Sequence, residues 1–262
     1  MAIAQPVTDS LAEHRFEVRS ITSRDLREAL AQGWADFLDK RGDLIFIGII
    51  YPLIGVVTAI VALGGPLLPL FFPLAAGITL LGPVAATGFY ELARRREDGI
   101  ECHWSHFLEV RNRPAWDRIM AVSSLLIAIF VAWIVSAGAL YAALIGVVPQ
   151  TVGEFLRLMF TTTEGWTLIV VGNLLGFAFA VLVFALSVVS LPMLVDRDVS
   201  ARTAIDTSIR AVMANKWMMV RWGLIVASML VIGSIPLFIG LAVALPVLGY
   251  STWHLYRHMV VQ

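Results

Sequence analysis

The sequence has few charged residues and a single cysteine. Asp, Glu, Lys and Arg make up 15% of its 262 residues, against about 25% in soluble domains. One cysteine, Cys102, excludes an intrachain disulfide. The formal net charge is zero, which argues against a nucleic-acid partner held by bulk positive charge. The first 43 residues contain no apolar run of the signal-peptide kind, so we expect the first membrane span to direct insertion.

The apolar segments contain almost no ionisable side chain. An ion-coupled transporter or proton pump would place Asp, Glu, Lys or His along its pathway, so these functions are disfavoured. The sequence also contains no catalytic motif. We therefore expect a protein that is not an enzyme, with no catalytic residue and no cofactor.

Hydrophobic residues are abundant instead, at 59% of the chain. A membrane-crossing helix needs about 20 apolar residues, and this criterion predicts an all-α polytopic protein with six transmembrane helices in three hairpins. The expected spans are about 44–63, 66–90, 119–148, 166–191, 217–235 and 236–256. Residues 1–20 are expected to be a flexible polar N-terminus, and 21–262 a single transmembrane domain. Gly233, Ser234 and Pro236 divide the last apolar region in two; the alternative is one bent span, which would move the C-terminus across the membrane.

The distribution of basic residues predicts the orientation. Of the 19 Lys and Arg residues, every one except Arg157 falls on the same side of this topology. Cytoplasmic segments carry an excess of Lys and Arg. We therefore expect the N-terminus and the C-terminus in the cytoplasm, and a location in a bacterial inner membrane.

Each hairpin is preceded by a cytoplasmic segment of amphipathic character. Residues 23–38 have an N-cap candidate and an apolar face, and residues 200–216 place Ile205, Ile209, Val212 and Met213 on one face. Residues 104–111 suggest a shorter version. We expect these segments to lie as interfacial helices. Seven of the eight tryptophans, all but Trp133, fall near expected span ends, as in an interfacial belt.

Several motifs resemble a bacterial membrane-protein family, domain of unknown function 2189. They are the runs 191–197 (LPMLVDR), 204–208 (AIDTS) with Asn215, 245–249 (LPVLG) with 252–257 (TWHLYR), 25–27 (DLR) with 33–37 (GWADF), and Gly82-Pro83. The likeness extends over roughly 21–260. The resemblance implies membrane residence and a helical fold, and some family members are loosely labelled as related to cytochrome c oxidase subunits.

Five side chains on the predicted cytoplasmic side could ligate a metal. Thiolate and imidazole bind zinc or copper, and the candidates are Cys102, His103, His106, His254 and His258. No paired cysteine or carboxylate at fixed spacing accompanies them, so we expect no metal site. The acidic pair Asp196 and Asp198 is interpreted as the start of the following helix, with Asp196 paired to an arginine.

Two further motifs predict contacts within the membrane or at its surface. Gly172, Asn173 and Gly176 form a GxxxG segment for close helix packing, within the chain or with a partner, and Asn173 is expected to hydrogen-bond between helices. Arg94, Arg95 and Arg96 follow the second expected span and could hold anionic lipid headgroups.

Three functions remain open at this point. The favoured one is a non-enzymatic accessory or scaffold subunit of a larger membrane complex, respiratory by resemblance. The alternatives are a channel or transporter for an uncharged or lipidic substrate, and an interfacial lipid-modifying enzyme. The expected partners are membrane lipids and a larger membrane complex or a second copy of the chain.

Overall fold

The computed structural model describes residues 15–39, 53, 56–57, 60, 67–70, 73–74, 82–149, 151–236 and 238–261. Over these residues the fold is all helical, as the sequence predicts, with no named strand. The α-helices are α1 (Ser23–Asp39), α5 (Gly82–Glu97), α6 (Trp116–Leu144), α7 (Val152–Thr161), α8 (Thr163–Ser187), α9 (Ser190–Asp196), α10 (Ala201–Ala214), α11 (Lys216–Ser234) and α12 (Leu241–Met259). Two 3₁₀ helices complete the described elements: η1 (Leu68–Leu70) and η2 (Trp104–Asn112).

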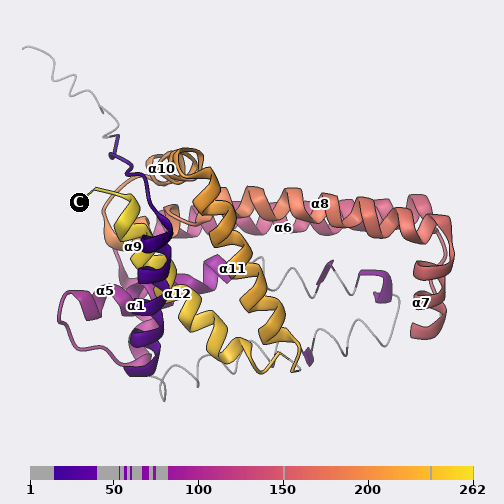
Figure 1. Ribbon diagram of the computed structural model, residues 1–262, viewed down its shortest axis with the longest axis horizontal. Helices are drawn as coiled ribbons and strands as arrows, with labels where there is room; N and C mark the ends of the chain where they lie inside the picture. Colours follow the sequence, from indigo (N-terminus) through magenta and orange to yellow (C-terminus); the bar gives the residue numbers. More distant parts are fainter. Residues whose placement is uncertain are drawn as a thin grey trace, which may run out of the picture.

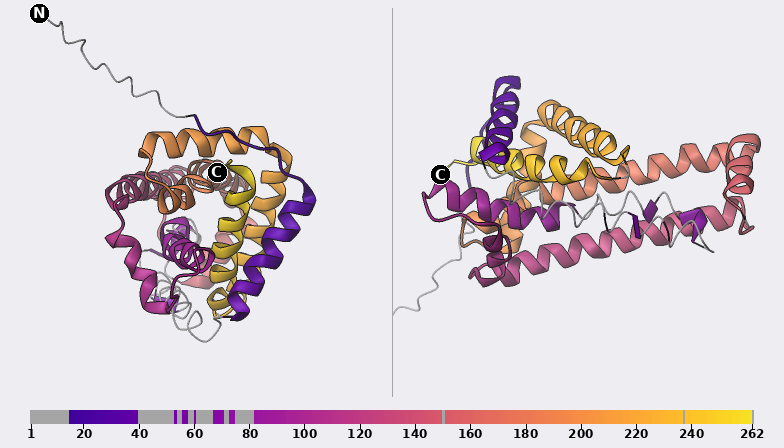
Figure 2. Two further views of the ribbon diagram at one scale, coloured as in Figure 1. Left: turned by 90° about the vertical axis from the view of Figure 1, so that its left-hand side faces the viewer. Right: turned by 90° about the horizontal axis from the view of Figure 1, so that it is seen from below.

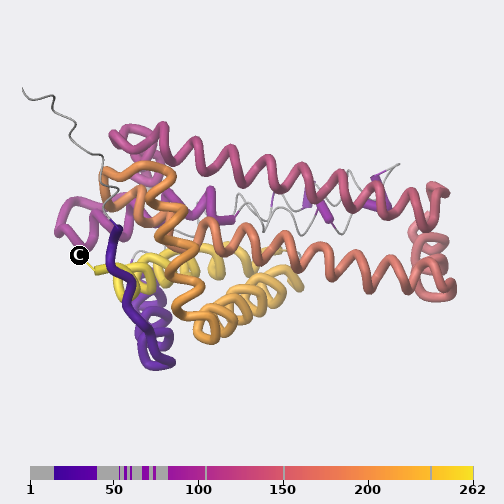
Figure 3. Tube along the Cα trace, turned by 90° about the horizontal axis from the view of Figure 1, so that it is seen from above, coloured from indigo at the N-terminus to yellow at the C-terminus, as the bar shows by residue number. Residues whose placement is uncertain are grey.

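The molecule is elongated, with different elements at its two ends (Figure 1). Helices α6 and α8 lie side by side as a long antiparallel arm, and α7 crosses one end of it (Figure 3). Helices α1, α5, α9 and α10 and the C-terminal half of α12 gather around the opposite end (Figure 2). We call this the polar end, and the end that carries α7 the far end.

Three segments of the described chain are long and apolar enough to cross a membrane: Trp116–Leu144, Thr163–Asp196 and Lys216–Ser234. They coincide with the spans expected at 119–148, 166–191 and 217–235. Most of the span expected at 44–63 lies outside the described residues, as do residues 66, 71–72 and 75–81 of the one expected at 66–90, whereas α5 includes 82–90. Helix α12 covers most of the span expected at 236–256, but its C-terminal half carries polar residues and it is not one of the three segments.

A proline and a serine shape the break between α8 and α9. Pro192 has no N–H, and its ring clashes with the carbonyl of the residue four positions earlier in a continuous helix. Accordingly, α8 ends at Ser187 and α9 begins at Ser190. The fully buried Ser208 of α10 satisfies backbone groups at this break: its Oγ accepts a hydrogen bond from Val189 N (3.2 Å) and donates one to Ala185 O (2.7 Å).

Helix α12 is the centre of the polar end. Its C-terminal half is almost entirely buried between α1 and α5. Two glycines allow these helices to come close: Gly33 of α1 lies against the backbone of Ser251, and Gly249 lies against Phe89 of α5. A Cβ added to Gly249 would be 2.7 Å from the Phe89 Cβ, a distance that real Cβ atoms do not show.

The expected interfacial segments are helical, and they bury only part of the faces predicted. In α1, Leu26 and Phe37 are buried, whereas Trp34 is exposed. In α10, the buried side is formed by small residues, namely Ala204, Thr207, Ser208 and Ala211. Ile209 and Met213 are exposed, because the close approach of α10 to α8 and α9 leaves room only for small side chains. Ile209 and Met213 therefore lie on the outer surface of α10, whereas Ile205 and Val212 pack partly against the core.

Two tryptophans expected in the interfacial belt are core residues. Trp222 and Trp253 are 1% and 0% exposed, respectively. Trp253 donates a hydrogen bond from its Nε1 to Glu97, which satisfies the polar edge of the buried ring. Trp166 and Trp217 are exposed, as belt residues would be.

The first described residues and the last ones lie together at the polar end. Val18 and Val260 form an isolated antiparallel bridge, and Arg19 N donates to Met259 O at 2.8 Å. The buried Asn215, between α10 and α11, holds the same segment: its Oδ1 accepts from Ile21 N and its Nδ2 donates to Arg19 O. The segment before α1 is thereby attached to two parts of the chain, the end of α12 and the junction between α10 and α11.

Candidate functional site

A buried carboxylate, Glu91 of α5, lies at the centre of the charged groups of the polar end. Its side chain is 2% exposed and contacts Arg94 at 2.7 Å, Arg113 at 3.8 Å and Arg95 at 3.9 Å. Arg94 binds it through two nitrogens, in the bidentate geometry that makes such pairs strong. Arg113 extends the contact to α9 by donating to Val195 O. One buried acid thus holds three guanidinium groups and, through them, the neighbouring segments.

The three arginines that end α5 are all paired with carboxylates. Besides Glu91, Arg94 contacts Asp98 and Arg95 contacts Glu109, at 2.6 Å and 2.7 Å. These pairs neutralise charge that would otherwise face lipid headgroups. Arg96 is the most exposed of the three, at 37%, and binding of anionic lipid by these arginines stays a prediction.

Helix α12 is joined to α1 by two contacts between a histidine and an aspartate. Asp36 of α1 is 3.1 Å from Arg96 and 2.7 Å from His254 Nε2. One turn further along α12, His258 lies 4.0 Å from Asp25. Hydrogen bonds from the Thr22 backbone and hydroxyl lower the pKa of Asp25, so this carboxyl is charged near neutral pH.

Asp196, at the end of α9, accepts bonds from two arginines and a tyrosine. Arg197 and Arg257 contact it at 3.3 Å and 3.1 Å, and the Tyr256 hydroxyl donates to it at 2.6 Å. Asp198 does not join this group: it is exposed and pairs with Arg118. The two acids therefore do not form a common metal or phosphate site.

Arg257 also binds Glu97, the last residue of α5, at 2.9 Å. Burial alone would raise the pKa of Glu97, but hydrogen bonds from Arg257 and Trp253 outweigh it and lower that pKa. The anionic form is therefore the one that ties α5 to α12. We define the ion-pair cluster as the following ten residues: Asp36, Glu91, Arg94, Arg95, Arg96, Glu97, Glu109, Arg113, Asp196 and Arg257.

The five candidate metal ligands lie in two places. His103 and His106 are neighbours in and before η2, with ring centroids 5.8 Å apart, and half-buried Cys102 lies against Leu92 O. His254 and His258 are on α12, each beside an aspartate of α1. Among the described residues, no group of three or more His, Cys, Asp or Glu side chains could hold a metal ion.

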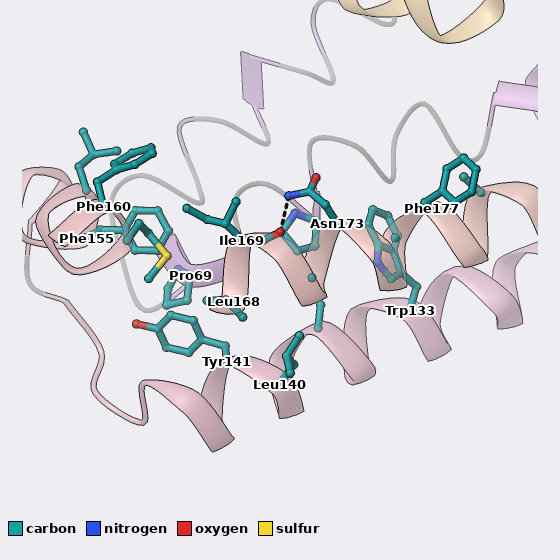
Figure 4. A pocket seen from close by; sticks show the side chains of 17 residues that line it. Pro69, Trp133, Leu140, Tyr141, Phe155, Phe160, Leu168, Ile169, Asn173 and Phe177 are labelled. Carbon is teal, nitrogen blue, oxygen red and sulfur yellow. Dashed lines mark hydrogen bonds between the residues drawn. The ribbon is translucent and has the colours of Figure 1, made fainter. Parts of the chain in front are cut away.

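A second site lies in the arm, between α6, α7 and α8 (Figure 4). It is a cavity of about 770 Å³ whose walls are almost wholly apolar. Gly172 and Gly176 of the GxxxG segment line it and face α6: an added Cβ would meet Leu140 at 3.9 Å and Trp133 at 3.5 Å. These are ordinary contact distances, so the glycines leave open space between the helices.

Asn173 also lines this pocket. Its Nδ2 donates to Ile169 O of its own helix at 2.7 Å, so this contact does not join α8 to another helix. Tyr141 donates to Val147 O near the far end. Helix α7 forms the end wall of the pocket through Phe155, Leu156, Met159 and Phe160.

Sequence analysis did not predict α7 or the pocket. The signal for α7 was present: Thr151 caps the helix by accepting a hydrogen bond from Glu154 N, and apolar residues recur at helical spacing after it. The pocket left no comparable signal, because its residues come from η1, α6, α7 and α8, which are far apart in sequence.

Comparison with known proteins finds a family similarity for part of the chain. No curated protein and no solved structure matches it significantly. Residues 71–196, from the second expected span to the end of α9, match a family model described as predicted integral membrane protein. Residues 71–196 are therefore similar to the integral membrane proteins of the domain of unknown function 2189 family, which is the family that the sequence motifs resemble.

Proposed function

We propose that the protein crosses a bacterial inner membrane six times, with its polar end in the cytoplasm. The pairing of Val18 with Val260 supports an even number of crossings, because it brings both described ends of the chain to one end of the molecule. The basic residues of the ion-pair cluster lie at that same end, whereas Arg157 is on α7 at the far end. This distribution follows the excess of positive charge in cytoplasmic segments.

Within this membrane we propose a non-enzymatic role, as an accessory or scaffold subunit of a larger complex. The observation that carries the proposal is the ion-pair cluster around Glu91. Its acids and arginines bind one another and hold α1, α5, α9, α12 and η2 together. Groups that bind one another in this way stabilise a rigid platform and are poorly placed to attack a substrate or transfer a proton, although the buried Arg113 Nε has no hydrogen-bond partner among the described residues.

The apolar outer surface of the helices supports the same role. Only 17% of the most apolar stretch of α11 is buried inside the molecule. Trp217, Leu224, Ile232 and Ile235 are each more than 60% exposed on it. Either lipid or another membrane subunit can cover such a surface. We favour a subunit, because close packing between membrane helices stabilises their association.

The test is purification from native membranes in a mild detergent, followed by mass spectrometry of the intact assembly. We expect the chain to be recovered with at least one further membrane protein in fixed stoichiometry. Haem-containing subunits would place it in a respiratory complex, as the family labels imply. Recovery of the chain alone, after gentle crosslinking in the membrane before extraction, would contradict the accessory role.

The pocket favours a second candidate function, a channel or transporter for an uncharged or lipidic substrate. Its volume of about 770 Å³ lies within the range of about 300–1,000 Å³ typical of small-molecule sites. An interfacial enzyme receives less support, since Asp196 is engaged by two arginines and the histidines are divided between two places.

A further inference from the structure

The pocket between α6, α7 and α8 offers two polar groups without a partner among the described residues, in a wall that is otherwise apolar except for Tyr141, whose hydroxyl donates to Val147 O. The Oδ1 of Asn173 accepts no hydrogen bond from any described residue, since the side chain uses only its Nδ2, toward Ile169 O. The indole N–H of Trp133, on the opposite helix, likewise donates no hydrogen bond within the described chain. The wall therefore presents one acceptor and one donor.

These two groups lie close enough to act on one ligand. The Trp133 Nε1 would be 3.6 Å from a Cβ on Gly176, so the indole lies over α8 at that residue. Residues three apart on a helix are neighbours, with Cβ atoms about 5–6 Å apart. Asn173 precedes Gly176 by that interval, and Figure 4 shows both side chains at the same cavity.

Asn173 is exposed on the side of the arm, so in a membrane the surroundings of this pair would be hydrocarbon. Asn173 follows the first residue of α8 by ten positions, which corresponds to about 15 Å along a helix. This length is half the thickness of a bilayer core, which is about 30 Å. Unpaired polar groups are costly at that depth because no water reaches them. A ligand that forms hydrogen bonds with both groups and fills the apolar space would be stabilised by those hydrogen bonds and by its apolar contacts.

We propose that this pocket binds a hydroxylated lipid, an apolar chain or ring of the bilayer that carries an alcohol or phenol group. A hydroxyl is both donor and acceptor. It can donate to the Asn173 carbonyl oxygen and accept from the Trp133 indole, while the apolar part lies against Leu140, Phe155 and Phe177. This inference goes beyond the accessory role and does not depend on it.

The experiment uses bromododecanol, whose bromine quenches the fluorescence of nearby tryptophan. Bromododecane, which has the same chain but no hydroxyl, is the control probe. Both are titrated into the full chain in detergent while fluorescence is recorded. We expect the alcohol to bind about ten times more tightly than the alkane, the effect of one hydrogen bond in an apolar site. Trp133→Phe should remove the saturable component of the quenching, since exposed Trp166 and Trp217 are quenched without saturation by probe in the detergent. Asn173→Leu should reduce the preference for the alcohol, because the Trp133 donor remains.

Blocking variants complete the test. Gly176→Leu should exclude both probes by filling the space beside Trp133, and Gly172→Leu serves in its place if the first variant loses its helical circular dichroism. Equal affinity for alcohol and alkane in the unmodified chain would overturn the proposal. So would saturable quenching that survives Trp133→Phe or a folded blocking variant.

Discussion

Gly33→Leu is expected to detach α1 from the polar end and to lower the free energy of unfolding by roughly 3 kcal/mol. A Cβ at this position would be 2.6 Å from the backbone N of Ser251 and 2.8 Å from its Cα. A flexible side chain could turn away, but the α12 backbone cannot, because α5 packs against its other side. Denaturant unfolding of the detergent-purified chain measures the loss, and limited proteolysis within α1 reports its detachment.

Gly223→Ala is the matched control for this substitution. Gly223 is also helical, but an added Cβ there has nothing within 4 Å. Alanine should therefore be neutral or should stabilise the helix by about 0.5–1 kcal/mol. If Gly33→Leu left unfolding and proteolysis unchanged, the close crossing of α1 over α12 would be wrong.

Glu91→Gln is expected to lower the free energy of unfolding about as much as Gly33→Leu does, for an electrostatic reason. The substitution removes the anion that faces Arg94, Arg95 and Arg113, and leaves three guanidinium groups around a neutral amide in a site that is 2% exposed. Removing one partner of a buried ion pair costs about 3–5 kcal/mol. Unfolding measurements on the purified chain should show this loss together with weaker retention of η2 and α9 against α5.

Asp98→Asn tests whether burial is the cause of the large loss of stability expected for Glu91→Gln. Asp98 binds the same Arg94, but its side chain is 42% exposed, and exposed ion pairs contribute at most about 1 kcal/mol. A small effect at Asp98 with a large one at Glu91 supports the account. Similar effects at both positions would mean that Glu91 is not a buried centre of the ion-pair cluster.

The helices that the sequence predicts well are those set by local rules. Leu126 and Val183 lie in apolar runs long enough to cross a bilayer, and the corresponding spans are present at the expected places. Ser200 marks the beginning of α10 because its hydroxyl accepts from Thr203 N, as an N-cap should. Such signals depend on neighbours within a few residues, so a single sequence is sufficient to find them.

The ion-pair cluster could not be predicted because its contacts join distant segments. Asp36 and His254 meet across 218 positions of the chain, and Glu97 and Trp253 across 156. A sequence shows that such charges exist but does not show which ones fold together. Trp253 illustrates the consequence: its place near a span end suggests the interface, but its contact with Glu97 places it in the core.

Labelling of single cysteines in intact cells tests the central claim, a membrane protein with its polar end in the cytoplasm. The chain has one cysteine, so Cys102→Ser gives a background in which exposed Glu28, on α1, or exposed Arg157, on α7, is replaced by cysteine. A membrane-impermeant maleimide should label Arg157→Cys in intact cells, and Glu28→Cys only after the membrane is opened. Labelling of Glu28→Cys in intact cells, with protection of Arg157→Cys, would contradict the account.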